Sequence, residues 1–436
     1  MENFTPAPPI PTPDTLPQLR ALGHKVGYFQ RCLTDHDIEI VTRIKDTNKT
    51  NPLWGARLNS EIVTFRSVMS SDAGYETFRA VGDKAWTKTR LRDAGINTPM
   101  GTLVNKERLH ESFEAAAQVG LPCVVKPKAG SHGKGVTLNV NTFHDFKRAV
   151  DQLDREVIVE KEITGQDYRV VTIGGKVVAG TLRKPANVVG DGKRTVTQLV
   201  EEKNQQRAAN PSLCRNLINI DDESTALLRE QGLLASDTPE RGQTIRLKRV
   251  ANIGSGGDSI DVTDLIHPGF AEICARIPAL FNSPEILGID ILASDISLPP
   301  DNQDWVVLEL NANPDIDIHR WPHKGTRRDI GSLLVRHYFP HAEEATPKSV
   351  ELTFKRSKND EKFRSSLRSR AIEFGVWGTG FVTNEEYFLR LEGTTAALDR
   401  LTNWILANGS TARLTATAPS QESDPVKQLT IRPLEM

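Results

Sequence analysis

The stretches SPEILGIDILAS (residues 283–294) and DWVVLELNANP (304–314) are two apolar runs that predict a pair of buried strands. Asp290 interrupts the first run, and Glu309 and Asn311 end the second. Glu309 and Asn311 are two residues apart, so in an extended chain their side chains point to the same face. Mg²⁺ takes one or two carboxylates and completes its shell with phosphate oxygens and water. Hydrogen-bonded polar residues at strand ends would explain either stretch alone, but the two together favour a metal site.

Further upstream, VVKPKAGSHGKGV (124–136) places a glycine-rich turn between two strand-like runs and predicts a hairpin. Its three closely spaced glycines let the backbone approach an anion, and successive N–H groups can cradle phosphate oxygens. Lys126 at the strand end and Lys134 in the turn would add positive charge. The turn lacks the Walker spacing GxxxxGK[ST], which counts against a P-loop, and alone it is also an ordinary tight turn.

A second glycine-rich segment, NIGSGGDS (252–259), follows the basic residues Arg246, Lys248 and Arg249. Between the two glycine-rich segments, VIVEKEITGQD (157–167) runs from a buried strand into carboxylates, which are costly to bury without partners. Solvated charges at a strand end would explain this last stretch if it stood alone. Two candidate phosphate-binding segments and one candidate magnesium site between residues 124 and 314 together predict a nucleotide site.

Helices and strands alternate around these motifs, so the predicted fold class is α/β or α+β. Helical spacing predicts helices over 76–94, 143–154, 197–235 (with a break at Pro211) and 327–339. The run DYRVVTIGGKVVAGTLRK (167–184) predicts two strands with a turn at Gly174 and Gly175.

Composition shifts divide the chain into five expected parts. These are a proline-rich leader (1–18), a small N-terminal α/β lobe (19–75), a central domain (76–340), a linker (341–349) and a C-terminal module (350–436).

Composition excludes several classes of protein. The 436 residues carry 55 basic and 56 acidic side chains, so no domain-scale positive charge is available for a nucleic acid or an anionic membrane. No apolar run approaches the ~20 residues that span a bilayer, and the first residues do not resemble a secretory signal. The four cysteines form no CxxC pair and suit a reducing compartment. We therefore expect a cytoplasmic protein with no nucleic-acid or membrane partner.

In their order and separation, these motifs resemble the ATP-grasp family of carboxylate ligases over residues 76–340. The resemblance is closest to amino-acid and peptide ligases such as cyanophycin synthetase and the glutathione synthetase half of bifunctional enzymes. The stretches RKPANVVGDGKRTVTQLVEEKN (183–204) and NIGSGGDSIDVTDLIHP (252–268) carry that closer match. The resemblance implies an ATP-grasp fold, in which two lobes grip ATP.

The resemblance also implies roles for individual residues. Lys84 and Lys126 would contact the ATP phosphates, and Ser131, His132 and Gly133 would close over them. Glu160 would meet the adenine amino group, the backbone of Lys161 and Ile163 would bind the purine edge, and Asp167 would bind the ribose. Asp290, Glu309 and Asn311 would hold two Mg²⁺ ions. Arg183, Arg249, Asn252, Gly256 and Gly257 would face the transferred phosphoryl group and the acyl phosphate.

One departure from the family concerns the charge beside Asp290. In D-alanine–D-alanine ligases an arginine precedes the GID-type dipeptide, whereas Gly288 stands there in this chain. We therefore expect the compensating positive charge to come from another segment.

The implied reaction activates an amino-acid or peptide carboxylate as an acyl phosphate, which an amine then attacks to give an amide, ADP and phosphate. Two other readings remain: a thiol ligase or a kinase that stops at the acyl phosphate, and a catalytically idle ATP-binding regulator. The segment DIDIHRWPHKGTRRDIG (315–331) could bind a substrate carboxylate through His319, Arg320 and Arg327, because arginine offers a bidentate fork. A solvated basic turn explains this segment equally well.

The C-terminal module weakly resembles acylphosphatase, whose glycine-rich signature loop ends in a catalytic arginine. Here GVWGTGF (375–381) is followed by Val382, so that arginine is missing. We expect an inactive α/β module, for which a ferredoxin-like fold is one option, for substrate capture or for contact within a homodimer.

Overall fold

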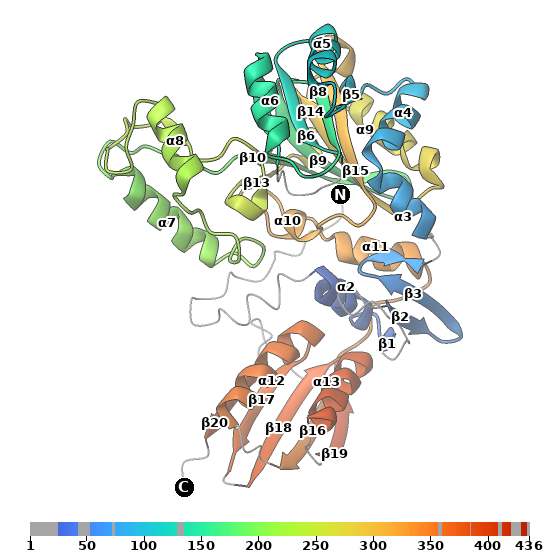
Figure 1. The fold of residues 1–436 in the computed structure, drawn as a ribbon. Coiled ribbons are helices and arrows are strands. Elements are labelled where there is room, and N and C mark those ends of the chain that lie inside the picture. Colours follow the sequence, from blue (N-terminus) through green and yellow to red (C-terminus); the bar gives the residue numbers. More distant parts are fainter. Residues whose placement is uncertain are drawn as a thin grey trace.

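The computed structural model describes residues 25–41, 53–71, 75–128, 135–355, 360–383, 385–408, 412–419 and 429–433. Four sheets of four or five strands and a two-stranded ribbon share these residues. The C-terminal module forms one end of the molecule, and an insert with two helices projects from the side of the central part (Figure 1). No helix in the described ranges is long and apolar enough to cross a membrane.

The N-terminal segment consists of one helix and a four-stranded antiparallel sheet. Its elements are α2(Lys25–Thr34), β1(Glu39–Val41), β2(Leu53–Leu58), β3(Glu61–Arg66) and β4(Met69–Ser70). Phe29, Trp54 and Phe65 pack in one core with Val171 and Ile286 of the central sheet. This segment therefore shares a core with the central domain.

Two helices stand where the sequence predicts one over 76–94. They are α3(Tyr75–Gly82) and α4(Lys84–Asp93). Asp83 separates them in an extended conformation, and its carboxylate accepts hydrogen bonds from the backbone N–H groups of Ala85 and Trp86. This N-cap begins a new helix, so the single-helix prediction is wrong.

The smaller lobe is a four-stranded antiparallel sheet of order β5-β8-β6-β7 with two helices. Its elements are β5(Gly101–Leu103), α5(Leu109–Val119), β6(Cys123–Pro127), β7(Thr137–Val140), α6(Phe143–Asp151) and β8(Val157–Lys161). The β6–β7 pairing confirms the predicted hairpin, and α6 confirms the helix expected after it. Phe146 and Val159 lie in the core between sheet and helices.

The larger lobe is built on a five-stranded sheet of order β13-β10-β9-β14-β15, antiparallel throughout. Its elements are β9(Gln166–Ile173), β10(Lys176–Lys184), β13(Asp258–Asp261), α9(Pro268–Arg276), β14(Ile286–Ala293) and β15(Trp305–Asn311). Phe270 and Cys274 of α9 pack against this sheet. The predicted turn at Gly174 and Gly175 is confirmed, and both glycines have positive φ.

An insert between β10 and β13 has its own small core. It contains β11(Asn187–Val189), α7(Val196–Ala208), α8(Asp222–Glu230) and β12(Thr244–Arg246). The helix break expected near Pro211 is confirmed, because α7 and α8 are separate. Short 3₁₀ turns are η3(Ile253–Ser255), η4(Thr263–Leu265), η5(Pro278–Phe281) and η6(Pro300–Asn302).

Two helices follow β15: α10(Asp317–Arg320) and α11(Ile330–Tyr338), the latter confirming the helix predicted there. The C-terminal module contains β16(Lys348–Lys355), α12(Asp360–Phe374), β17(Trp377–Val382), β18(Glu386–Gly393), α13(Thr395–Ala407), β19(Ala412–Pro419) and β20(Leu429–Pro433). Its sheet has the order β19-β16-β18-β17-β20. Helix α2 packs on α11 on one side and on α12 and α13 on the other, so it connects the module to the rest of the chain (Figure 1).

The glycine-rich stretch of the C-terminal module is mostly strand. Residues Trp377–Val382 form β17 between α12 and β18. A Cβ on Gly378 would lie 2.1 Å from the carbonyl oxygen of Arg390, so close strand packing requires this glycine. Most of the stretch that resembles the acylphosphatase signature is therefore part of the sheet.

Candidate functional site

One row of polar side chains crosses the five-stranded sheet, with one residue from each strand. Strand register places Asp261 opposite Thr181, Thr181 opposite Arg169, Arg169 opposite Asp290, and Asp290 opposite Glu309. Residues directly opposite one another on antiparallel strands have side chains on the same face. We call these five residues the polar row. Segments far apart in the sequence therefore meet on one face of the sheet.

Asp290 is the buried centre of the polar row, and two arginines hold its carboxylate. Arg169 binds it through Nε and, at 3.0 Å, through Nη2, while Nη2 of Arg183 lies 2.9 Å from Oδ2. Arg183 also donates from Nε to Asp167 at 2.7 Å. A Cβ on Gly288 would lie 3.3 Å from Cδ of Arg169, so the glycine leaves room for this side chain. Arg169 thus brings the positive charge that we expected from another segment.

Arg169, Arg183 and burial shift the pKa values of Asp290 and of its neighbour Asp167 in opposite directions. Burial by itself would raise the pKa of Asp290, but Arg169 and Arg183 outweigh it and hold the pKa at about 2. Burial raises the pKa of Asp167 to about 6, with Asp290 adding to the increase and Arg183 opposing it. One arginine therefore serves two carboxylates.

Glu309 and Asn311 lie beside Asp290 at the end of β15. The Glu309 carboxylate is 37% exposed and pairs with Lys84 at 3.1 Å, and Asn311 Oδ1 accepts from the N–H of Asn313. Two carboxylates and an amide fit a hard cation such as Mg²⁺, although both Asp290 oxygens already accept from arginine. The described ranges contain no group of three or more His, Cys, Asp or Glu side chains placed to hold a metal.

Helix α4 connects both lobes through two lysines one turn apart. Lys84 reaches Glu309 on the large sheet, and Lys88 pairs with Glu160 on the small sheet. The other oxygen of Glu160 pairs with Lys126 at 2.7 Å. Lys88, Glu160 and Lys126 form a buried group, which we call the lysine triad, with two cations and one anion. Sequence reasoning missed Lys88, although its spacing from Lys84 places both on one face of a helix.

The lysine triad has more positive than negative charge, and the pKa values of Lys88 and Glu160 reflect this excess. Burial, followed by the charge of Lys126, lowers the pKa of Lys88 to about 8. Burial would raise the pKa of Glu160, but the two lysines lower it overall. An added anion would relieve the repulsion between the lysines.

The remaining residues expected near ATP are placed in different ways. The backbone N–H of Lys161 donates to the Met100 carbonyl at 2.9 Å. Ile163 lies in the link between β8 and β9, and its backbone makes no hydrogen bond within the described ranges. Ser131, His132 and Gly133 lie outside the described residues.

The segment from Asn252 to Gly257 uses its amides internally. The Asn252 side chain accepts from the N–H of Gly254, and its carbonyl accepts from the N–H of Gly257 at 3.0 Å. Gly256 donates to the Ile253 carbonyl. A Cβ on Gly256 would lie 2.8 Å from Ile218, and one on Gly257 would lie 2.6 Å from the Asn252 oxygen. Packing thus accounts for both glycines, and an open phosphate cradle is not formed here.

The remaining basic residues that we singled out are not all brought to the polar row. Arg249 pairs with Glu230 of α8, on the insert. The guanidinium of Arg320 lies 3.5 Å from the ring centre of Tyr28, and that of Arg327 lies 4.1 Å from the ring centre of Trp321. Both therefore stack on aromatic rings.

His319 does reach the polar row. It is buried, and its Nδ1 lies 2.8 Å from the hydroxyl of Thr181. Burial, with Arg169 and Arg183 nearby, lowers its pKa to about 3, so it is neutral. Sequence reasoning missed its neighbour Asp317, whose pKa burial and then Asp315 raise to about 8. His319 Nε2 and Asp317 Oδ1 have no hydrogen-bond partner among the described residues.

Comparison with known proteins agrees with this architecture. Residues 81–206 match the RimK-like ATP-grasp domain. Cyanophycin synthetase of Nostoc sp. is 33% identical over 284 residues, which are 64% of this chain and 31% of that protein. The glutathione biosynthesis bifunctional protein GshAB of Mannheimia succiniciproducens is 32% identical over 283 residues, 62% of this chain and 37% of that protein. This chain thus spans about a third of the length of these relatives.

A solved structure gives the same result. The crystal structure of a bifunctional glutathione synthetase from Pasteurella multocida matches with a TM-score of 0.53 and 28% identity, over 70% of this chain and 42% of that chain. The predicted mixed α/β class is confirmed, and the two lobes fit an ATP-grasp fold. The chain therefore contains a RimK-like ATP-grasp domain and is homologous to the cyanophycin synthetases and to the bifunctional glutathione synthetases.

Proposed function

We propose that this protein is a Mg-ATP-dependent ligase that joins an amino-acid or peptide carboxylate to an amine. The observation that carries the proposal is the polar row, in which Asp290 lies opposite Glu309 and Arg169, together with Arg183, which binds Asp290 from beside the row. The homology to cyanophycin synthetase and to the glutathione biosynthesis protein GshAB supports the same chemistry. ATP-grasp ligases use ATP and Mg²⁺ in general.

In this proposal, the ATP phosphates bind near Lys84, Lys88 and Lys126, which outnumber the carboxylates paired with them. Lys126 and Lys88 share a single acid, Glu160, so the lysine triad can accept an anion without losing its own ion pairs. Lys84 can release Glu309 to contact the phosphates. Glu160 would accept a further hydrogen bond from the adenine amino group, with the Ile163 amide, which has no partner among the described residues, at the purine edge and Asp167 at the ribose.

The metal ligands are the three residues that the sequence indicates. Asp290, Glu309 and Asn311 would hold one or two Mg²⁺ ions, which neutralise charge on phosphate oxygens. Arg183 already bridges two carboxylates, and it would transfer one of its contacts to the phosphoryl group. Little covalent chemistry is needed from the protein, because positioning and charge neutralisation lower the barrier.

The substrate binds beside α10 in this proposal. His319 is neutral and hydrogen-bonded to Thr181 of the polar row, so its other nitrogen can contact the acceptor. Arg320 and Arg327 would reach a substrate carboxylate only by leaving their aromatic partners. Arg249, Asn252, Gly256 and Gly257 contact no substrate in this proposal, because Arg249 pairs with Glu230 and the other three residues bond within their own segment.

The decisive experiment measures phosphate release with ATP and a panel of amino acids and dipeptides, and identifies the product by mass spectrometry. Glu309→Gln should abolish turnover while the protein stays folded, and the exposed control Glu156→Gln should not. Wild-type activity in Glu309→Gln would contradict the metal assignment.

Other outcomes of the same panel would replace the proposal. Turnover that requires a thiol acceptor would indicate a thiol ligase, and a hydroxylamine-trapped product without an amine would indicate a kinase. Nucleotide binding without any turnover would indicate a regulator.

The C-terminal module fits a ferredoxin-like fold in this proposal. Its first six elements have the order β-α-β-β-α-β, and four strands pair in the order β19-β16-β18-β17. We propose that it captures substrate or contributes to a homodimer and has no acylphosphatase activity. Sedimentation of the full chain tests the dimer, and acetyl phosphate hydrolysis tests the inactivity.

A further inference from the structure

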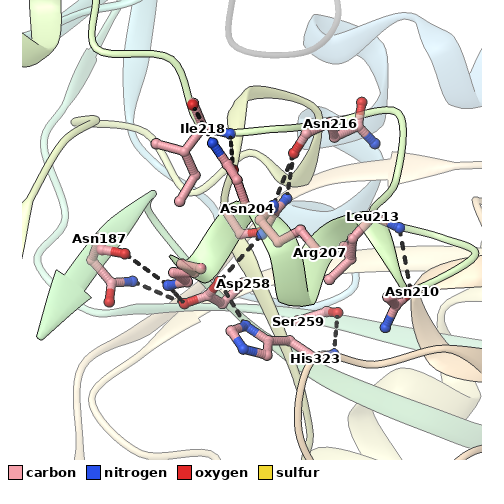
Figure 2. Close-up of polar contacts among 12 residues, drawn as sticks. Asn187, Asn204, Arg207, Asn210, Leu213, Asn216, Ile218, Asp258, Ser259 and His323 are labelled. Carbon is pink, nitrogen blue, oxygen red and sulfur yellow. Dashed lines mark hydrogen bonds and ion pairs between the residues drawn. The ribbon is translucent and has the colours of Figure 1, made fainter. Parts of the chain in front are cut away.

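A cavity of about 330 Å³ lies between helix α7 of the insert and strands β10, β11 and β13. Lys184, Lys203 and Lys324 line it, and Val189 and Ile260 contribute apolar surface. Asp258 lies in its floor, and Figure 2 shows the contacts of that carboxylate with Asn187, Arg207 and His323. The cavity is large enough for a small organic molecule.

Both carboxylate oxygens of Asp258 already accept hydrogen bonds or ion pairs. Oδ1 of Asp258 lies 2.7 Å from His323 Nδ1 and 3.4 Å from Arg207 Nη1. Oδ2 lies 2.6 Å from Lys203 Nζ and 3.0 Å from Asn187 Nδ2 (Figure 2). Four donors in fixed positions leave the carboxylate no capacity for a cationic ligand.

Positive charge in the cavity is, in contrast, unmatched. Glu202, the other acid in the lining, pairs with Arg194. Lys184 and Lys324 have neither a hydrogen bond nor an ion pair from their ammonium groups within the described part of the chain. The surroundings also affect Lys203, because burial and then the nearby Arg207 and Lys184 lower its pKa against the effect of Asp258. The cavity therefore favours an anion.

The cavity is separated from the polar row by the backbone of β10. Arg183 points toward Asp167 and Asp290, and the next residue, Lys184, must point to the opposite face because side chains alternate along a strand. Asp258 lies opposite Lys184 in the register and shares its face. A ligand here would not occupy the proposed nucleotide site.

We propose that this cavity binds a small aliphatic dicarboxylate, with its two carboxylates at Lys184 and Lys324 and the carbon chain between them against Val189 and Ile260. The apolar wall distinguishes this ligand from inorganic phosphate, which has no group to place there. The proposal does not depend on the ligase activity.

The test uses isothermal titration of the full-length protein with succinate and, separately, with inorganic phosphate. Wild-type protein should bind succinate saturably, and the Lys184→Met/Lys324→Met double variant should bind it at least about tenfold more weakly. Lys193→Met, an exposed lysine of the insert, should bind like wild type. MgATP affinity should be equal in all three proteins, and circular dichroism checks that each is folded.

Three results would overturn the proposal. They are the absence of saturable succinate binding to wild type, equal succinate affinity in the double variant, and phosphate binding as tight as succinate binding with the same loss in the double variant.

Discussion

Asp290 and Asp258 are both buried aspartates held by two cationic side chains, yet their surroundings differ. Asp290 lies on an inner strand of the large sheet, where Glu309 stands opposite it and Asp167 shares Arg183 with it. Asp258 lies on the edge strand, where the neighbouring lining residues include Lys184 and Lys324, whose ammonium groups have no partner among the described residues. One cluster therefore has acids competing for bases, and the other has bases in excess.

The difference shows that burial and ion pairing do not by themselves identify a reactive carboxylate. Arg183, beside the polar row, can exchange partners, because both Asp167 and Asp290 are within its reach. Asp258 is tied to four donors at once and connects α7 to β13, so its first role is structural. Changing each aspartate should therefore give different phenotypes.

The largest effect is expected for Asp290→Asn. Asparagine keeps the size but removes the charge that Arg169 and Arg183 share, and it weakens a proposed metal ligand. Phosphate release should fall by at least about 100-fold, the scale of losing one charge-stabilising group in an active site. Asp301→Asn, an exposed control, should be unchanged. Turnover within tenfold of wild type would mean that the polar row is not the reactive centre.

Asp258→Asn should instead reduce stability. Arg207, which is 1% exposed, and Lys203 would lose their common acid. Removing one partner of a buried ion pair costs about 3–5 kcal/mol, and urea denaturation would measure it. The surface variant Asp151→Asn should cost less than about 1 kcal/mol. Folded Asp258→Asn protein should keep a turnover within a few-fold of wild type. A loss of turnover as large as that of Asp290→Asn would contradict the structural role of Asp258.

The sequence predicts the strands that carry Asp290 and Glu309, but it does not predict how these strands pair with the rest of the sheet. The apolar runs around Asp290 and Glu309 predict two strands, and the two-residue spacing places Glu309 and Asn311 on one face. Arg169 stands opposite Asp290 only because β9 pairs with β14, more than 100 residues away. Nothing in the local pattern specifies that pairing. Gly288 was the one indication that a charge from another segment would fill the gap.

At helix boundaries and in glycine-rich segments, too, the sequence indicates local features but not the contacts that the structure shows. Aspartate commonly begins a helix, so the sequence itself contained a signal for the N-cap at Asp83. The apolar spacing across Asp83 nevertheless predicted one continuous helix. The glycines at 256 and 257 suggested an anion cradle, because a glycine-rich sequence does not reveal whether its amides are free. In the structure they donate to Ile253 and Asn252.

Gly257→Ala sharpens the comparison at the residue beside Asp258. A Cβ would lie 2.6 Å from the Asn252 oxygen and 2.7 Å from the Lys184 oxygen, and both are backbone atoms that cannot rotate away. The Gly257 carbonyl also accepts from Arg207 at 3.0 Å. We expect a loss of about 1–3 kcal/mol in unfolding free energy. Gly82→Ala, where nothing lies within 4 Å of the added carbon, should be neutral or slightly stabilising, and equal losses in the two variants would contradict the packing account.

The smallest effect concerns the lysine triad, which has its bases in excess like the Asp258 cluster but joins helix α4 to the small sheet. The pKa of Lys88 is lowered to about 8 by burial and by Lys126, so Lys88 is charged at neutral pH and loses its proton above pH 8. MgATP affinity should therefore fall by up to about tenfold for each pH unit above that value. Lys88→Arg stays charged and should flatten this profile, which titration calorimetry at several pH values would measure.

Stability should change in the opposite direction, and this separates the triad from general alkaline damage. Unfolded Lys88 keeps its proton up to its ordinary pKa of 10.5, so between pH 8 and that value the unfolded state binds more protons than the folded state. The unfolding free energy therefore rises with pH through this window, by comparison with Lys88→Arg. Lys147→Arg, on the exposed face of α6, should match wild type in both measurements. If wild type and Lys88→Arg have the same pH profile for MgATP, the excess charge of the triad does not serve phosphate binding.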